Sequence, residues 1–191
     1  MQIWAGLGNP GAKYALHRHN VGFMATDIIA EAHGFGPWQK KFRSLVAEGR
    51  IGSHRVLLLK PQTFMNDSGD AVQQALRFYK LEVDALTAFH DELDLAPFKV
   101  KVGGGTAGHN GLRSIDASLG PDFRRVRIGI GHPGPGRKDL VTPHVLGNYA
   151  RSEMEPLSDM LAAIASEAEW LASGDDARFM SEVALRLQQE G

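Results

Sequence analysis

The chain of 191 residues has no cysteine, which excludes disulfide bonds, a cysteine nucleophile and a cysteine-ligated metal. It also lacks any apolar run near the roughly 20 residues that cross a membrane, and its N-terminus has no basic-then-apolar signal pattern. We therefore expect a cytoplasmic protein without a membrane partner. The hydrophobic content of 43% is typical of a globular chain, and the length favours one domain over residues 1–191.

Net charge is also nearly absent, at −1, but the charged residues are unevenly distributed. Residues 99–138 contain eight Lys or Arg and two acidic residues, whereas residues 151–191 contain three and nine. A near-neutral protein with a basic middle can bind a polyanion through one face. The net charge alone would argue against a nucleic-acid partner. We retain this possibility because of the basic segment.

Strand and helix patterns alternate along the chain. Apolar runs and apolar–polar alternation predict strands at residues 3–7, 42–51, 54–59, 86–90, 98–102 and 123–130. Helical periodicity predicts helices at 21–33, 68–79 and 112–119, and two acidic helices from 152 onward that separate near 173–174. Residues 36–41 and 131–136 are expected to be loops. Because Gly52-Ser53 fits a hairpin turn, we predict an α/β fold with a mixed sheet covered on both faces.

The stretch from Ala5 to Gly22 is the strongest candidate for a functional site. A turn at residues 8–11 ends the first predicted strand, and Tyr14, His19 and Asn20 precede the next helix. Open α/β folds place their sites between the carboxyl end of a strand and the following helix. His19 fits a general base, since a histidine is mostly neutral at pH 7. The alternative is a surface histidine that flanks a helix.

Residues 6–11 also match G-x-G-x-x-G, a pattern typical of dinucleotide binding after a strand. Residues 129–134 match it too, so the pattern has little weight in a chain with 22 glycines. Pro10 removes an amide that a pyrophosphate would need, and the predicted helix does not begin at Gly11. We expect no dinucleotide cofactor.

Residues 90–94, with the sequence His-Asp-Glu-Leu-Asp, admit three interpretations. They could supply a carboxylate that orients His19, hold a metal ion, or form a solvated acidic turn. On a strand end, His90, Glu92 and Asp94 would share one face and Asp91 the other.

Two further segments add candidates. Residues 103–111 are rich in glycine and present His109 and Asn110 at the start of a predicted helix. They fit a backbone that approaches a ligand closely, or a flexible hairpin tip. Phe64 and Asn66 belong either to a site or to the core and a helix cap.

Basic residues alternate along two predicted strands. Lys99 and Lys101 should share one face while Val100 and Val102 pack inward, and Arg125 and Arg127 follow the same alternation on residues 123–130. This face could bind RNA phosphates, or it could be a solvated sheet edge that charge protects from aggregation.

Taken together, these motifs resemble bacterial-type peptidyl-tRNA hydrolases in order and spacing, over about residues 2–150. The matching segments are residues 6–11, Tyr14, 18–20, 63–66, 90–95, 108–112 and 127–134.

The resemblance implies an α/β/α monomer with a twisted mixed sheet, which cleaves the ester between a peptide and the terminal ribose of tRNA without a metal or another cofactor. It implies that His19 is the catalytic base and that Asp91 holds it. The implied site further includes Asn9, Asn66 and Asn110 as lining residues, His109 as a substrate-binding residue, Tyr14 and Phe64 as contacts to the tRNA end or the peptide, and Lys99, Lys101 and Arg127 as contacts to tRNA phosphates. Ala107 departs from the pattern, since a glycine is expected there, and the short C-terminal tail is acidic.

Two other classes of function remain as alternatives. A catalytically silent RNA-binding protein would keep the basic face but lose the base or its partner, whereas His19 and Asp91 are both present. A metal-dependent hydrolase would use the residues 90–94.

Overall fold

The structure, a computed structural model, describes residues 1–93, 98–134 and 136–190. Its centre is a seven-stranded sheet in the order β2-β3-β4-β1-β5-β7-β6. The strands are β1 (Gln2–Gly6), β2 (Gln39–Lys41), β3 (Ser44–Ile51), β4 (His54–Pro61), β5 (Leu86–Glu92), β6 (Phe98–Val102) and β7 (Arg124–Gly129). Strand β1 is parallel to β4 and β5, and β7 is parallel to β5, whereas β2, β3 and β6 join by antiparallel pairs. The predicted α/β class with a mixed sheet is confirmed.

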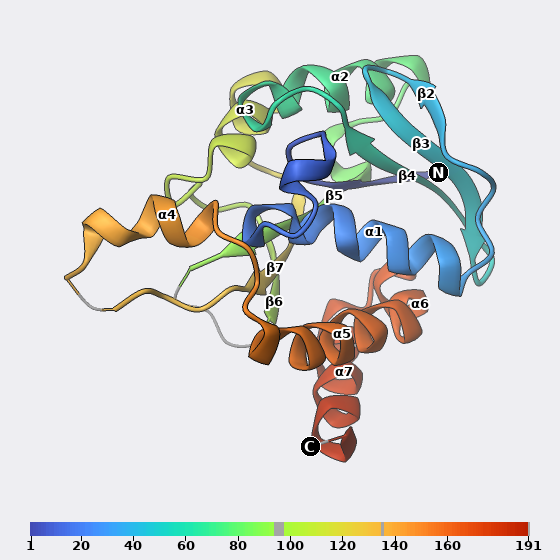
Figure 1. Cartoon of the computed structure of the whole chain (residues 1–191). Helices are drawn as coiled ribbons and strands as arrows, with labels where there is room; N and C mark the ends of the chain where they lie inside the picture. The colour runs from blue at the N-terminus through green and yellow to red at the C-terminus, as the bar shows by residue number, and fades with distance from the viewer. Residues whose placement is uncertain (94–97, 135, 191) are drawn as a thin grey trace.

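Helices cover both faces of this sheet (Figure 1). One face is covered by α1 (Val21–Ala32), α5 (Arg151–Ser166), α6 (Ala168–Ala172) and α7 (Asp176–Glu190). The other face is covered by α2 (Ser68–Phe78) and α3 (Asn110–Leu119). The short helix α4 (Val141–Val145) projects to one side of this body. Single 3-10 turns occur at η1 (Ala12–Tyr14), η2 (Arg18–Asn20), η3 (Met65–Asp67), η4 (Val83–Ala85) and η5 (Lys138–Leu140).

The alternation of apolar residues along the strands builds two cores. In β1, Trp4 packs in the core on the α1 side, while Ile3 and Ala5 pack in the core on the α2 side. All three side chains are fully buried. Because successive strand residues face opposite sides, β1 must be apolar throughout.

The structure differs from the sequence prediction at three elements. Residues 39–41 form strand β2 rather than a loop, because they pair with Ser44–Val46 of β3. The acidic C-terminal segment forms three helices, since a break at Glu167 adds to the predicted break near Gly174. Helix α4 was not predicted, because five residues that include Pro143 carry too little helical periodicity.

No helix within the described ranges is long and apolar enough to span a bilayer. Asp94, which the sequence groups with His90 and Glu92, lies outside the described residues.

Candidate active site

Two polar residues meet at the carboxyl ends of β1 and β5. His19 lies in η2, directly before α1, and Asp91 lies near the end of β5. The first turn of α1 packs against these strand ends through Gly22. A Cβ atom at Gly22 would lie 2.3 Å from the Phe89 carbonyl oxygen and 2.4 Å from the Leu7 amide nitrogen. Only glycine permits this approach, which brings η2 within hydrogen-bond reach of β5.

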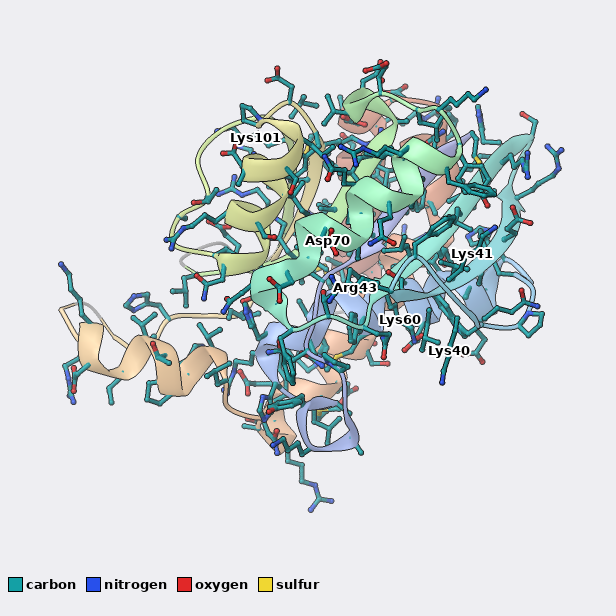
Figure 2. The ribbon with its side chains drawn as sticks, turned by 90° about the horizontal axis from the view of Figure 1, so that it is seen from above. Lys40, Lys41, Arg43, Lys60, Asp70 and Lys101 are labelled. Carbon is teal, nitrogen blue, oxygen red and sulfur yellow. The ribbon has the colours of Figure 1, made fainter. Side chains whose placement is uncertain are left out.

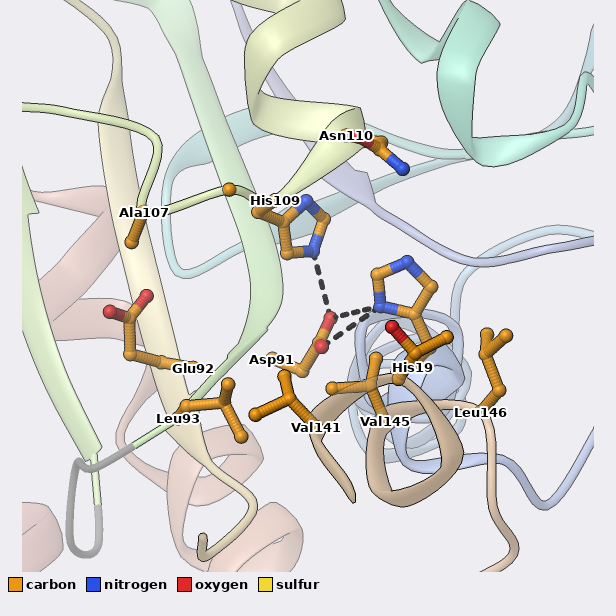
Figure 3. Close-up of a pocket in the computed structure, with 12 residues that line it drawn as sticks. His19, Asp91, Glu92, Leu93, Ala107, His109, Asn110, Val141, Val145 and Leu146 are labelled. Carbon is orange, nitrogen blue, oxygen red and sulfur yellow. Dashed lines mark hydrogen bonds and ion pairs between the residues drawn. The ribbon is translucent and has the colours of Figure 1, made fainter. Parts of the chain in front are cut away.

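The carboxylate of Asp91 lies between two histidines (Figure 3). His19 Nδ1 is 2.9 Å from both Asp91 oxygens, and His109 Nε2 is 2.8 Å from Oδ1. All three side chains are buried. The structure therefore brings together three of the residues that the sequence singled out, and it adds a direct Asp91–His109 contact that sequence spacing could not reveal.

The hydrogen-bond partners indicate which ring nitrogens of the two histidines carry a proton. His109 Nδ1 accepts from the backbone amides of Gly111, at 3.1 Å, and Leu112, at 3.2 Å. That nitrogen is therefore unprotonated, so Nε2 carries the hydrogen and donates it to Asp91. His19 Nδ1 likewise donates to Asp91, and its Nε2 has no hydrogen-bond partner among the described residues, so the neutral form of the ring presents its lone pair at Nε2. The arrangement can accept a proton at His19 Nε2 and stabilise the resulting imidazolium.

Burial alone would raise the pKa of the Asp91 carboxyl, but the interactions with His109 and His19 hold that pKa well below its ordinary value. Asp91 is thus an anion at neutral pH. Behind it, burial lowers the pKa of His90 to about 3, so this ring is neutral. His90 Nδ1 donates to the Asp91 carbonyl oxygen at 2.8 Å and fixes the end of β5.

Within the described ranges, His19, Asp91 and His109 are also residues that could hold a metal ion, with one ligand atom of each within 4.8 Å of the others. This set is not the 90–94 cluster proposed from the sequence, since it draws only Asp91 from that segment. The nitrogen–oxygen distances of 2.8–2.9 Å are hydrogen-bond lengths. The amides at His109 Nδ1 direct a proton, not a lone pair, toward Asp91. Hydrogen bonding alone thus accounts for the geometry.

A cleft of about 370 Å³ opens over the Asp91 carboxylate. Its polar floor is formed by His19, Asp91, His109 and Asn110. Its apolar wall comes from helix α4 and the residue after it, which contribute Val141, Val145 and Leu146 (Figure 3). This wall is not predicted from the sequence, where the helical spacing of Val141 and Val145 is its one signal.

Arg18 connects this wall to the turn that carries His19. Its guanidinium donates to the His144 carbonyl oxygen at 3.0 Å and to both carboxylate oxygens of Glu153, at 2.7 and 3.3 Å. Its backbone amide donates to the Gly147 carbonyl oxygen at 2.9 Å. Burial alone would raise the pKa of Glu153, but Arg18 and the Ala150 amide lower it. Arg18 therefore sets the separation of the two sides of the cleft.

Asn9 is held in one orientation by two loops. Its side-chain oxygen accepts from the Met65 amide at 2.8 Å, and its backbone amide and carbonyl bond to the side chain of Asn20, each at 2.9 Å. Asn20 therefore binds Asn9 rather than capping α1 with its side chain. Because the Asn9 oxygen faces Met65, its NH2 group faces the other way as a donor.

Three other predicted residues lie beside the cleft rather than in its lining. Phe64 is 59% exposed, and its ring centroid is 6.5 Å from that of Tyr14 in an edge-on arrangement. Asn66 is exposed on η3, one residue beyond the Met65 amide that binds Asn9.

Ala107, where the family resemblance implies a glycine, has a φ of 48°. This left-handed conformation is one that glycine adopts without strain and alanine does not. The departure therefore carries a cost in backbone strain, and it places a methyl group on the cleft lining.

The predicted basic face is only partly available. Lys99 pairs across the ladder with Arg127, and both Lys99 and Lys101 are exposed. Arg127 donates to Glu92 at 3.2 Å. Contrary to the prediction that both valines of β6 pack inward, Val102 is 59% exposed.

Arg125 is buried rather than surface-directed, and it donates to the carbonyl oxygens of Gly104, Gly105 and Pro121 at 2.6–3.1 Å. Lys101 and Arg127 line a smaller cavity of about 190 Å³, which shares Glu92 and Ala107 with the main cleft. Two of the three predicted phosphate contacts therefore adjoin the site.

Comparison with known proteins agrees with this geometry. The family model described as peptidyl-tRNA hydrolase matches residues 3–190. A peptidyl-tRNA hydrolase of Erythrobacter litoralis is 70% identical over 190 residues, which cover 98% of this chain and all of the relative. One from Zymomonas mobilis is 61% identical over 98% of this chain and all of the relative. The crystal structure of peptidyl-tRNA hydrolase from Acinetobacter baumannii is 38% identical, with a TM-score of 0.88 over 96% of this chain and 94% of that one. The chain therefore belongs to the peptidyl-tRNA hydrolase family.

Proposed function

We propose that this protein hydrolyses the ester that joins a peptide, or an N-blocked amino acid, to the terminal ribose of tRNA, and so recycles tRNA during translation. The observation that carries this proposal is the His19 ring, whose Nδ1 is held 2.9 Å from both oxygens of a buried carboxylate at the floor of a cleft. Family membership supports the substrate class.

In the proposed mechanism, His19 Nε2 takes a proton from a water molecule as that water attacks the ester carbonyl carbon. The Asp91 anion stabilises the imidazolium that forms. The tetrahedral intermediate then expels the ribose oxygen, which takes the proton back from His19. The products are a tRNA with a free ribose hydroxyl and a peptide with a free carboxylic acid, which then loses its proton to solvent.

The oxyanion of the intermediate requires hydrogen-bond donors. Asn110 lines the cleft beside His109, so its amide is the best placed of the predicted donors. His109 takes a positioning role, because both its nitrogens are already engaged. Asn66 remains a candidate contact to substrate at the rim.

Asn9, Tyr14 and Phe64 form the proposed approach for the two ends of the substrate. The Asn9 NH2 group is directed by the Met65 amide and suits a peptide carbonyl oxygen. The edge-on pair of Tyr14 and Phe64 offers exposed aromatic surface to a base or a peptide side chain. Lys99, Lys101 and Arg127 are the proposed contacts to tRNA phosphates.

We further propose that residues 1–191 act as one domain and as a monomer in the cytoplasm, where translation takes place. The two cores support a single domain, because both pack on the same sheet.

Incubation of the protein with an N-acetylated aminoacyl-tRNA, with and without EDTA, tests the function. The proposal predicts release of the N-acetylated amino acid at the same rate in both. Loss of activity with EDTA would support the metal-dependent alternative, and tRNA binding without hydrolysis would support the silent RNA-binding one.

A further inference from the structure

A second groove lies at the free edge of the sheet, at the same end of the strands as the His19 cleft. β3 begins at Ser44, which pairs with Pro61 at the carboxyl end of β4. The β2–β3 turn at Phe42 and Arg43 is therefore level with the turn that follows β1. The groove has a volume of about 640 Å³ and is lined by Lys40, Lys41, Arg43, Ser44, Leu45, Gln62 and Thr63.

Positive charge gathers along this groove. In Figure 2, Lys40, Lys41 and Arg43 lie to the right of Lys101, which is at the upper left. Lys41 Nζ lies 4.1 Å from the centre of the Phe78 ring, and Arg43 donates to Asp70. Lys40 is exposed. Neither lysine has a carboxylate partner among the described residues, so both keep a positive charge at this groove, with Lys41 held over the rings of Phe42, Phe78 and Tyr79.

Lys60 lies close to this group in Figure 2 but is already neutralised, because it donates to Asp27 at 2.6 Å. It is therefore left out of the proposed groove.

Thr63 provides a second, independent indication of a ligand. The residue is only 6% exposed, and its hydroxyl oxygen has no hydrogen-bond partner among the described residues. It lines the same groove as the lysines. A buried hydroxyl without a partner is unfavourable, and an acceptor oxygen that entered the groove would remove this cost.

The turn beside the groove has a strained backbone that its surroundings hold in place. Phe42 and Arg43 have φ values of 55° and 52° in a two-residue hairpin turn, where asparagine and glycine are the preferred residues. The Arg43 carbonyl accepts from the Gln62 amide at 2.8 Å. The turn is thereby fixed beside the loop that carries Thr63 and Phe64, and strained residues of this kind cluster at binding sites.

The position of the groove selects its ligand. The proposed substrate extends from the ester in two directions, as a tRNA arm and as a peptide arm. The RNA arm is assigned to Lys99, Lys101 and Arg127 on the β6–β7 side of the cleft. The peptide arm therefore leaves on the other side, past Phe64. Strands β3 and β2 lie three and four strand spacings away from β5, a distance of about 14–19 Å. An extended peptide covers this distance in about four to six residues.

We propose that this groove binds acidic side chains of the nascent peptide about four to six residues from the ester, so that the protein cleaves such peptidyl-tRNAs faster than neutral ones. This inference rests on the proposed hydrolase function. RNA phosphates are the weaker candidate, because one RNA arm would then have to reach both edges of the sheet.

The test compares two substrates that share one tRNA. Each carries an N-acetylated hexapeptide, with either aspartate or asparagine at the three positions farthest from the ester. We expect the ratio of kcat/KM for the acidic over the neutral peptide to be about two- to fivefold in the wild-type protein, the range of exposed ion pairs. In Lys40→Gln/Lys41→Gln this ratio should fall to about one.

The matched control is Arg50→Gln/Arg55→Gln, which removes two positive charges at the other end of the same strands and should keep the wild-type ratio. Lys40→Gln alone removes a charge without disturbing the Phe78 contact, and it should lower the ratio partially. A wild-type ratio of one would overturn the proposal. Equal losses on both peptides in Lys40→Gln/Lys41→Gln would also overturn it and would indicate RNA binding instead. Failure to cleave either substrate would refute the hydrolase function itself, so the two failures are distinct.

Discussion

The protonation of one ring explains how a single carboxylate can serve two histidines. Two backbone amides at the start of α3 donate to His109 Nδ1, which forces its proton onto Nε2, toward Asp91. Asp91 therefore receives one hydrogen from each histidine, and its two oxygens have no freedom to rotate away. His109 thus fixes the Asp91 carboxylate, and this carboxylate in turn orients the His19 ring.

Asp91→Asn should lower kcat severely, by about 10⁴-fold if it acts as in an analogous triad in which the carboxylate becomes an amide. An amide has one acceptor oxygen for two N–H donors, so its NH2 group must face one of the histidines. It also cannot stabilise an imidazolium. Asp84→Asn, a change in η4 far from the cleft, is the control for hydrolysis of N-acetylated aminoacyl-tRNA. A loss below threefold would show that Asp91 does not orient His19.

His90 should make stability depend on pH. Burial holds its pKa at about 3 in the folded protein, compared with an ordinary value near 6.5. Between these values the unfolded chain binds the proton and the folded chain does not, so the free energy of unfolding falls as the pH falls. His90→Asn keeps a donor near the Asp91 carbonyl but cannot titrate.

Urea unfolding between pH 4.5 and 6 should therefore give a steeper slope for the wild type than for His90→Asn, by about 1.4 kcal/mol per pH unit. This window lies above the ordinary pKa of an aspartate, so Asp91 does not contribute to the slope. Parallel slopes for the two proteins would contradict a neutral, buried His90.

At the scale of elements, the cleft depends on a short helix that the sequence barely signals. α4 has five residues and one proline, and a helix of this length is marginal on its own. It is held by contacts from outside: His144 Nε2 lies 2.9 Å from the Ile130 carbonyl oxygen, and Arg18 donates to the His144 carbonyl. The wall of the site is thus positioned by the turn that carries His19.

Arg18→Lys should raise KM about tenfold with a smaller change in kcat, because lysine cannot bond Glu153 and the His144 carbonyl together. Glu153→Gln should have a similar effect. If the two residues act through one contact, the double variant should lose little more than either single variant. Arg137→Lys, in an exposed pair with Asp139, is the control. Additive losses would show that Arg18 does not act through Glu153.

Across the whole molecule, the basic segment is less basic than its sequence suggests. Arg124 pairs with Asp176, Arg125 is enclosed by backbone carbonyls, and Arg127 pairs with Glu92. Lys99 and Lys101 remain exposed. On strands β6 and β7, the charge that remains free to bind RNA therefore resides chiefly in Lys99 and Lys101.

Lys101→Ala should raise KM for full-length substrate and leave kcat nearly unchanged, because a phosphate contact positions the substrate and takes no part in the chemistry. The plot of log affinity against log salt should become flatter by roughly 0.7 to 0.9. Arg55→Ala, at the opposite end of the strands, should change neither. An unaltered salt slope would show that Lys101 does not contact phosphate.

The sequence predicted the strands and long helices because their apolar periodicity reflects burial against a core. The pattern of residues 90–94 alone left three interpretations open, and only the family resemblance implied that Asp91 holds His19, a contact that the structure contains. β2 was missed, because three polar residues become a strand only when β3 supplies a partner. The burial of Arg125 was missed for a similar reason: its acceptors come from residues distant in sequence.

The role of His19 as general base can be measured by single-turnover hydrolysis of N-acetylated aminoacyl-tRNA with the His19→Ala variant. With enzyme in excess, the variant should bind the substrate and fold as the wild type does, with a hydrolysis rate lower by about 10²- to 10⁴-fold. A folded His19→Ala protein that hydrolyses the ester at nearly the wild-type rate would contradict the mechanism.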